Sequence, residues 1–345
     1  MIHVLISIVG LWLLLIILRS MIRTALMNRH YRDFFAEVTG RAVLMVVARR
    51  LRSRSHATAT HLALLWFFPA YILSLITVYF IGALTAFGFL FWGTRAVGSW
   101  QQAFIASGSA LDTLGFATPT TLIGQWLSIP EGALGLGIVV FLFTFIPSYQ
   151  AVIRLREDRT SWLYIRTEDQ PTGVRLLEWC QRTGVLDNMS EVWKAWEDWF
   201  RMLGDTHSVL PMLTVSPSVQ SDQSWVLAAG AVLDAAALSA SSIQSRDAEA
   251  ARICVQTGTR ALLAIADALG QVGPVAEQER PRLSRESYES ARNRLSSAGI
   301  PLRPAADPEA QWQDFLSLRG SYEDALFFIG HRTFAPPLNN WSRTA

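Results

Sequence analysis

Charge is scarce in the first 153 residues of this 345-residue chain. They contain 10 of the 30 basic residues and only 4 of the 28 acids. Over the whole chain 17% of the residues are charged, against about 25% in a typical soluble protein. This shortage excludes an ordinary soluble protein and predicts that the first part of the chain lies in a membrane. Residues 154–345 have the charge of a soluble domain.

Cysteines, a basic excess and catalytic motifs are also missing. The two cysteines, Cys180 and Cys254, are too few for a disulfide-stapled scaffold. A net charge of +2, with more acids than bases after residue 153, argues against a nucleic-acid partner. The sequence has no P-loop, no HExxH or GxSxG motif and no paired cysteines for zinc. We therefore predict no enzyme, no catalytic residue, no resident metal and no cofactor.

Three long apolar runs predict three transmembrane helices, over residues 1–18, 55–94 and 132–153. A helix of roughly 20 apolar residues crosses the hydrocarbon core of a bilayer. The first run lacks the basic start and small-residue cleavage site of a signal peptide, which indicates an uncleaved anchor. The second run is longer than one perpendicular span. It predicts a tilted helix, or a helix with an apolar connection.

The arginines set the orientation of these spans. Residues 19–54 carry nine Arg and two acids, whereas residues 92–131 carry one Arg and two acids. Because positive loops stay inside, the first loop is expected in the cytoplasm and the second outside. A further basic cluster follows the third run (Arg154, Arg156 and Arg159). We expect a multi-pass protein of the cell membrane, with its N-terminus outside and residues 154–345 in the cytoplasm.

The stretch between the second and third runs predicts a re-entrant helix. Residues 96–111 suit a helix about 24 Å long, which is too short to cross. An extended segment, residues 113–117, would then return to the outside. The helix would point its negative C-terminal end at the membrane centre, where it favours a cation. Irregular backbone at that depth is tolerated only against protein or water. The alternative is an extracellular loop whose helix packs on the bundle.

This order of elements resembles the pore module of tetrameric potassium channels of the two-helix type, over about residues 60–153. The segment that carries the resemblance is Thr113-Leu114-Gly115-Phe116-Ala117. By position, Thr113 matches the filter threonine, Gly115 the first filter glycine and Phe116 the aromatic residue. Ala117 replaces the second glycine, and Thr118 replaces the acid that usually follows. The resemblance implies a homotetramer that conducts monovalent cations, potassium or sodium, with potassium selectivity weakened at Ala117.

Residues around this segment have two interpretations each. Asp112 either supports the filter as a buried carboxylate that accepts hydrogen bonds, or is a solvated loop acid. Gly135 and Gly137, with Pro147, either form a gating hinge in the inner helix or serve close helix packing.

A basic amphipathic segment, residues 40–54, precedes the second run. It is predicted to lie on anionic lipids through residues 41–54, either as a plain anchor or as a slide helix that couples the cytoplasmic domain to the pore.

The second part of the chain predicts an all-α bundle of about six helices. We expect Ser221 and Asp222 to cap one helix, Ser284 to cap another over 285–297, and separate helices over 308–318 and 322–330. Three side-chain sets could have a functional role, such as a ligand site at the tryptophans or a metal or acid–base site at His207, but the structural interpretation of each is favoured. The tryptophans 193, 196 and 199 suit a core, His207 suits a helix C-terminal cap, and Asp234 suits an ion pair with Arg252 or Arg260.

The sequence therefore predicts an all-α membrane protein in three parts. Residues 1–54 form an anchor and interfacial segment, 55–153 a pore module, and 154–345 a cytoplasmic helical domain. The leading hypothesis is a homotetrameric cation channel, of potassium type, regulated by the helical domain. The alternative is a membrane-anchored binding or signalling protein whose helical domain carries the function. The sequence identifies no regulatory ligand or partner.

Overall fold

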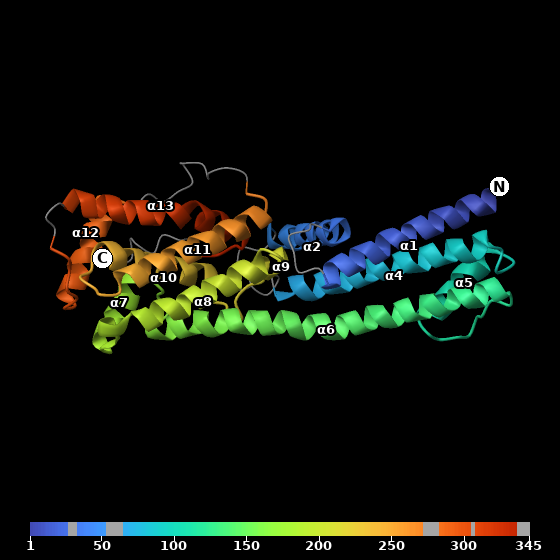
Figure 1. Cartoon of the computed structure of the whole chain (residues 1–345), viewed down its shortest axis with the longest axis horizontal. Helices are drawn as coiled ribbons and strands as arrows, with labels where there is room; N and C mark the ends of the chain where they lie inside the picture. The colour runs from blue at the N-terminus through green and yellow to red at the C-terminus, as the bar shows by residue number, and fades with distance from the viewer. Residues whose placement is uncertain (27–32, 53–64, 272–282, 305–307, 337–345) are drawn as a thin grey trace. The chain divides into compact units, whose positions relative to one another are not determined.

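The computed structural model describes the chain except for residues 27–32, 53–64, 272–282, 305–307 and 337–345 (Figure 1). The described residues form helices and no strand, apart from one isolated bridge between Ile243 and Leu302. The all-helical prediction is confirmed. The chain divides into two compact units, Met1–Gln150 and Ala151–Ala345.

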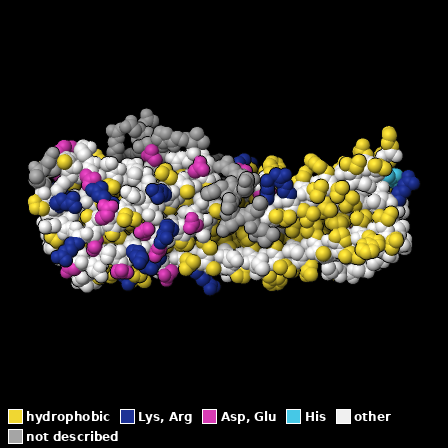
Figure 2. Space-filling model, in the orientation of Figure 1, with side chains coloured by type: hydrophobic (Ala, Val, Ile, Leu, Met, Phe, Trp, Pro, Cys, Tyr) yellow, Lys and Arg dark blue, Asp and Glu magenta, His cyan; other side chains and the backbone are white. Residues whose placement is uncertain are grey.

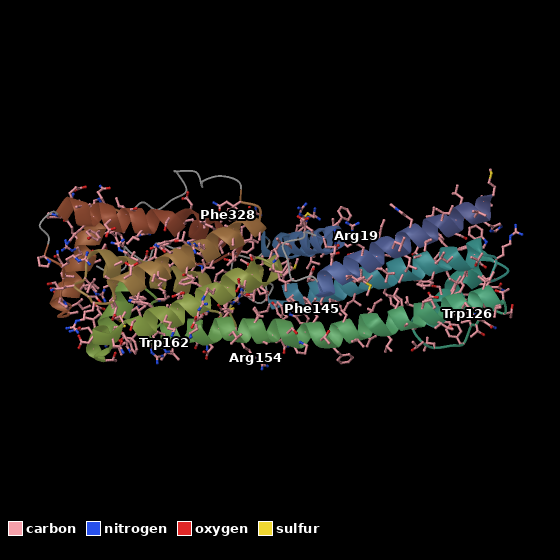
Figure 3. All side chains as sticks on the ribbon, in the orientation of Figure 1. Arg19, Trp126, Phe145, Arg154, Trp162 and Phe328 are labelled. Carbon is pink, nitrogen blue, oxygen red and sulfur yellow. The ribbon has the colours of Figure 1, made fainter. Side chains whose placement is uncertain are left out.

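Three helices are long and apolar enough to cross a membrane: α1 (Ile2–Leu26), α4 (Phe67–Gly93) and α6 (Leu122–Arg166). The surface of the first unit is accordingly rich in hydrophobic side chains, whereas charged side chains are scattered over the second unit (Figure 2). The prediction of three helices that could span a membrane is confirmed. Arg19 lies on α1, and Trp126 lies in α6 with an exposed ring (Figure 3).

Helix α6 begins ten residues earlier than the apolar run 132–153 indicated. Its 45 residues correspond to about 67 Å, roughly twice the thickness of a hydrocarbon core. Glu131 and Pro130 therefore lie inside the helix and not at the end of an outer loop. The apolar residues before them supply the extra turns, and Pro130 does not end the helix.

Helices α1 and α4 pack closely in opposite directions. A Cβ atom on Gly10 would come within 2.8 Å of the Ala86 carbonyl oxygen, and one on Gly82 would come 2.5 Å from Ile17 Cδ1. Because residues later in α1 contact residues earlier in α4, the two helices are antiparallel. Small residues at such contacts allow close van der Waals packing between helices in a membrane.

Helix α2 (Phe34–Arg52) covers most of the predicted basic segment, whose last two residues lie outside the described part. Asp33 caps it, because its Oδ1 accepts hydrogen bonds from the backbone N–H groups of Phe35 (3.0 Å) and Ala36 (3.1 Å). The same oxygen accepts from Ser20 Oγ on α1 at 2.7 Å. The start of α2 is thereby attached to α1.

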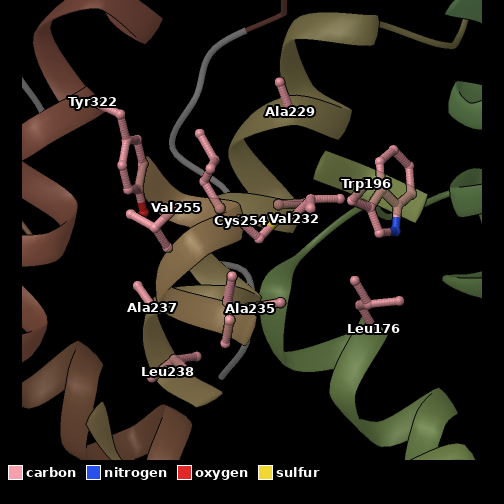
Figure 4. Packing of buried hydrophobic residues seen from close by; sticks show 14 of the residues in the cluster. Leu176, Trp196, Ala229, Val232, Ala235, Ala237, Leu238, Cys254, Val255 and Tyr322 are labelled. Carbon is pink, nitrogen blue, oxygen red and sulfur yellow. The ribbon is translucent and has the colours of Figure 1, made fainter. Parts of the chain in front are cut away.

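The second unit packs around one buried helix, α10 (Trp225–Ser241). Every residue of α10 is buried except Asp234, which is partly buried. Around it are further helices: α7 (Gly173–Arg182), α8 (Ser190–His207), α9 (Pro211–Val215), α11 (Ala248–Ala268), α12 (Arg285–Ser297) and α13 (Pro308–Arg332). Figure 4 shows Leu176, Trp196, Val255 and Tyr322 among the buried side chains of this core.

Some local predictions for this unit are confirmed and others are wrong. Ser284 caps α12, as predicted, with Oγ accepting from Ser287 N–H at 3.1 Å. Helix α10 is capped by Ser224 and not by Ser221 or Asp222. Helix α13 is one helix where two were expected, because buried side chains recur along its whole length (Phe315, Arg319, Tyr322, Leu326 and Ile329).

Candidate functional site

Helix α5 (Trp100–Leu111) folds back along α4 in the first unit. A Cβ on Gly88 would lie 3.1 Å from the Phe104 ring, and one on Gly108 would lie 3.4 Å from Leu84 Cδ1. Residues later in α5 thus contact residues earlier in α4, so these two helices are antiparallel. Ser99 caps α5, accepting a hydrogen bond from Gln102 N–H. With 12 residues α5 is about 18 Å long, which is shorter than a membrane span.

The same helix runs beside the first turns of α6 in the same direction. A Cβ on Gly132 would lie 3.3 Å from the Ala110 carbonyl oxygen, and one on Gly135 would overlap that of Leu111. Between the two helices the chain returns, since Thr121 Oγ1 donates to the carbonyl oxygen of Ala96 at 3.2 Å. The path from residue 94 to residue 122 therefore goes part of the way along the spans and comes back to the same end.

The backbone N–H groups of the segment after α5 donate hydrogen bonds to the last turn of that helix. Leu114 and Gly115 both donate their backbone N–H to the Ser109 carbonyl oxygen, at 3.0 and 3.2 Å. Ala117 N–H donates to the Ser109 hydroxyl at 2.9 Å, and Thr113 N–H to the Ala110 carbonyl oxygen at 3.0 Å. Ser109 is buried. Ser109 therefore accepts hydrogen bonds from three of the five residues of the predicted filter segment.

The carbonyl groups of the same segment are free. Among the hydrogen bonds of the described residues, none ends on a carbonyl oxygen of residues 113–117. Thr113 (φ 55°) and Gly115 (φ 68°) both have left-handed backbone. This conformation is uncommon for a β-branched residue, and such outliers cluster at functional sites. Left-handed residues at alternate positions turn successive N–H groups to one side. The carbonyl oxygens are then left for another ligand.

The side chains of this segment are not covered by the chain itself. Leu114 is 66% exposed and Phe116 71% exposed, although both are large and apolar. Asp112 is the C-cap of α5, and its carboxylate is exposed and forms no ion pair among the described residues. In the single chain this exposure fits the loop-acid interpretation, and the filter-supporting role would need groups from another chain.

The three predicted hinge residues differ in their surroundings. Gly135 is a packing position, because α5 touches it through the Leu111 carbonyl oxygen. A Cβ on Gly137 would meet no atom within 4 Å. Pro147 lies inside α6, which continues as one helix beyond it. The hinge role of Gly137 and Pro147 stays a prediction.

The sequence reasoning missed Ser107 and Glu131. Both side chains are completely buried, and Ser107 Oγ forms a hydrogen bond with Glu131 Oε1. The same hydroxyl lies 3.0 Å from the Leu84 carbonyl oxygen on α4. The signal that could have found Glu131 is the uncharged, mostly apolar stretch 122–130 directly before it, which places the acid inside a span.

His207, in the second unit, is a buried structural residue. Its Nε2 lies 3.4 Å from the Arg156 guanidinium, and its Nδ1 lies 2.9 Å from Thr206 Oγ1. Burial, and then the charge of Arg156, hold the pKa of His207 well below its ordinary value. Arg156 is itself buried and donates to the carbonyl oxygens of Leu213 (2.8 Å) and Ser216 (3.1 Å). The described residues contain no group of three or more side chains suited to a metal.

The expected partners of Asp234 are wrong. Tyr322 donates its hydroxyl to Asp234 Oδ1 at 2.6 Å, and Arg319 Nε lies 3.9 Å from the same oxygen. Arg252 pairs instead with Asp314, at 2.6 Å. The ion-pair interpretation holds, with a different helix as partner. The three tryptophans 193, 196 and 199 are buried in the core, as their structural interpretation expected.

Comparison with protein-family models, with curated proteins and with solved structures finds no match to this chain.

Proposed function

We propose that this chain is one subunit of a homotetrameric cation channel whose filter is formed by residues Thr113–Ala117. The observation that carries the proposal is the row of free carbonyl oxygens after α5, on a segment whose N–H groups are bound by Ser109 and Ala110. Carbonyl oxygens replace the hydration shell of a permeant cation in such filters. The negative end of α5 lies next to them and favours positive charge.

The tetramer is proposed because the carbonyl oxygens of one chain are too few to surround an ion. One segment surrounds only part of an ion, so a ring of copies is needed to replace its water. Closed cyclic symmetry provides such a ring from identical chains. Apolar neighbours in an assembly would also cover Leu114 and Phe116, which the single chain leaves exposed. The permeant ion is potassium, with sodium as the competing ion because Ala117 stands at a glycine position.

The proposed orientation follows the arginine distribution. The N-terminus is outside, the second unit is cytoplasmic, and α2 lies on anionic lipids. The helical unit regulates the pore, since α6 contributes residues to both units.

The experiment is a planar-bilayer recording of the full chain under asymmetric potassium and sodium. A cation-selective reversal potential is expected. Gly115→Val should abolish the current while the tetramer persists in size-exclusion chromatography, because a bulky residue resists φ near 68°. Gly320→Val is the control, since a Cβ on this α13 glycine meets no atom within 4 Å. Anion current, or full current in Gly115→Val, would favour the membrane-anchored signalling protein instead.

A further inference from the structure

Three helices of the first unit meet at one hydroxyl group. Ser107 Oγ on α5 lies 3.0 Å from the Leu84 carbonyl oxygen on α4 and forms a hydrogen bond with Glu131 Oε1 on α6. Ser107 and Glu131 both have no exposed surface. The contact therefore joins α4, α5 and α6 in a place that water does not reach.

The hydrogen atoms at this contact can be counted. A serine hydroxyl has one hydrogen, and a carbonyl oxygen or an ionised carboxylate can only accept. Ser107 faces two acceptors with that single hydrogen if Glu131 is ionised. Both contacts are hydrogen bonds at once only when the Glu131 carboxyl donates to Ser107 and Ser107 donates to Leu84.

The second carboxyl oxygen supports the same assignment. Glu131 Oε2 is buried and has no hydrogen-bond partner among the described residues. Among the described residues, no arginine, lysine or histidine forms an ion pair with Glu131. Helices α4 and α5 contain no Asp, Glu, Lys, Arg or His. An ionised carboxylate with a bare oxygen is costly inside a membrane, whereas a neutral acid costs much less.

The pair is also close to the segment proposed as the filter. Ser107 precedes Ser109 by two residues on α5, and Ser109 binds the N–H groups of Leu114, Gly115 and Ala117. A shift of Ser107 therefore moves the serine that orients this segment.

We propose that Glu131 is a positioning residue that acts as a neutral, hydrogen-bond-donating acid and holds the C-terminal half of α5 between α4 and α6. Its effect on ion selectivity rests on the proposed channel function, whereas the neutral acid itself does not.

Infrared spectroscopy tests the neutral acid directly. Full-length protein in lipid vesicles at neutral pH is compared with Glu131→Gln, and the difference spectrum should show loss of one protonated-carboxyl C=O band. Glu37→Gln is the matched control, because Glu37 is ion-paired with Arg41 on α2 and should contribute no such band. If the band is unchanged in Glu131→Gln, the proposal is overturned.

Bilayer recordings of the same variants test the positioning role. Glutamine keeps a donor and an acceptor in nearly the same shape, so Glu131→Gln should retain the wild-type potassium-to-sodium permeability ratio. Glu131→Ala and Ser107→Ala should each reduce the ratio, by up to about fivefold, the factor that corresponds to the free energy of one buried hydrogen bond. The double variant should add little, because both changes remove one contact.

The outcomes separate this inference from the channel proposal. If Glu131→Gln behaves as Glu131→Ala, the charge matters and the positioning role is overturned. If the wild-type chain carries no current but the infrared band disappears in Glu131→Gln, the neutral acid stands and the channel proposal fails. A selective current with no change in the band contradicts this inference alone.

Discussion

The carbonyl oxygen of Leu111, the last residue of α5, lies against Gly135 of α6 so closely that a Cβ at residue 135 would overlap it. This contact sets how near the end of the short helix comes to the long one. It explains why an apolar span carries a glycine at this position.

Gly135→Ala should therefore destabilise the first unit. The added methyl group has no room against backbone atoms, and such overpacking costs about 1–3 kcal/mol. Gly137→Ala is the control two residues away, where a Cβ meets nothing within 4 Å and alanine favours the helix. The midpoint of thermal unfolding in detergent should fall for Gly135→Ala only. Equal midpoints would show that the two helices separate at little cost.

Ala117→Gly should sharpen the potassium preference of the proposed channel. A methyl group at this position resists left-handed backbone, which glycine adopts freely. The reversal potential in asymmetric potassium and sodium should move toward the potassium equilibrium potential. An unchanged reversal potential would mean that the outer end of the segment does not determine selectivity.

Pro147→Ala should change the open probability of the proposed channel and leave its selectivity unchanged. Proline lacks the N–H that would bind the Phe143 carbonyl oxygen one turn earlier, and prolines of this kind kink helices. Residues on both sides of Pro147 contact α4, because the Phe68 ring stacks on Tyr149 and on Phe145. Single-channel recording measures both quantities. An unaltered open probability would favour a packing role for this part of α6.

The orientation of the spans can be tested by cysteine labelling. Ser20 is unsuitable, because it is buried and forms a hydrogen bond with the Tyr79 hydroxyl at 3.0 Å. Arg41 and Gln101 are exposed, and the native Cys180 and Cys254 are buried. An impermeant thiol reagent added outside intact cells should label Gln101→Cys and leave Arg41→Cys unlabelled. The reverse pattern would invert the proposed topology.

His207 should make the second unit less stable in acid. Its folded pKa lies well below 6.5, so near pH 6.5 the unfolded chain takes up a proton that the folded chain does not. The stabilisation is present above pH 6.5 and is lost as the pH falls, at up to about 1.4 kcal/mol per pH unit. Denaturation of the full chain followed by circular dichroism at pH 7.5 and 5.5 measures this slope. His207→Gln should flatten it, and a flat wild-type profile would contradict the assignment.

Much of the helical architecture was predictable, because its causes are local. Long runs without charge require helices that can satisfy their backbone in lipid. The Ser284 hydroxyl caps α12 by accepting a hydrogen bond from the backbone N–H of Ser287, only three residues later. The re-entrant interpretation of residues 96–117 likewise depends on length and on which segments carry charge, and its use as a filter stays a prediction.

The remaining features depend on which helix faces meet. By itself the sequence determined the helical class, the three apolar spans and the position of the segment 113–117. Only the tertiary structure decided that Glu131 is buried against Ser107, that Asp234 pairs with Arg319 and Tyr322, and that Ser109 binds the amide groups of the segment. These contacts join residues far apart in the chain or beyond a turn. Their partners follow from packing, because a buried polar group takes whichever donor or acceptor its neighbouring helix provides.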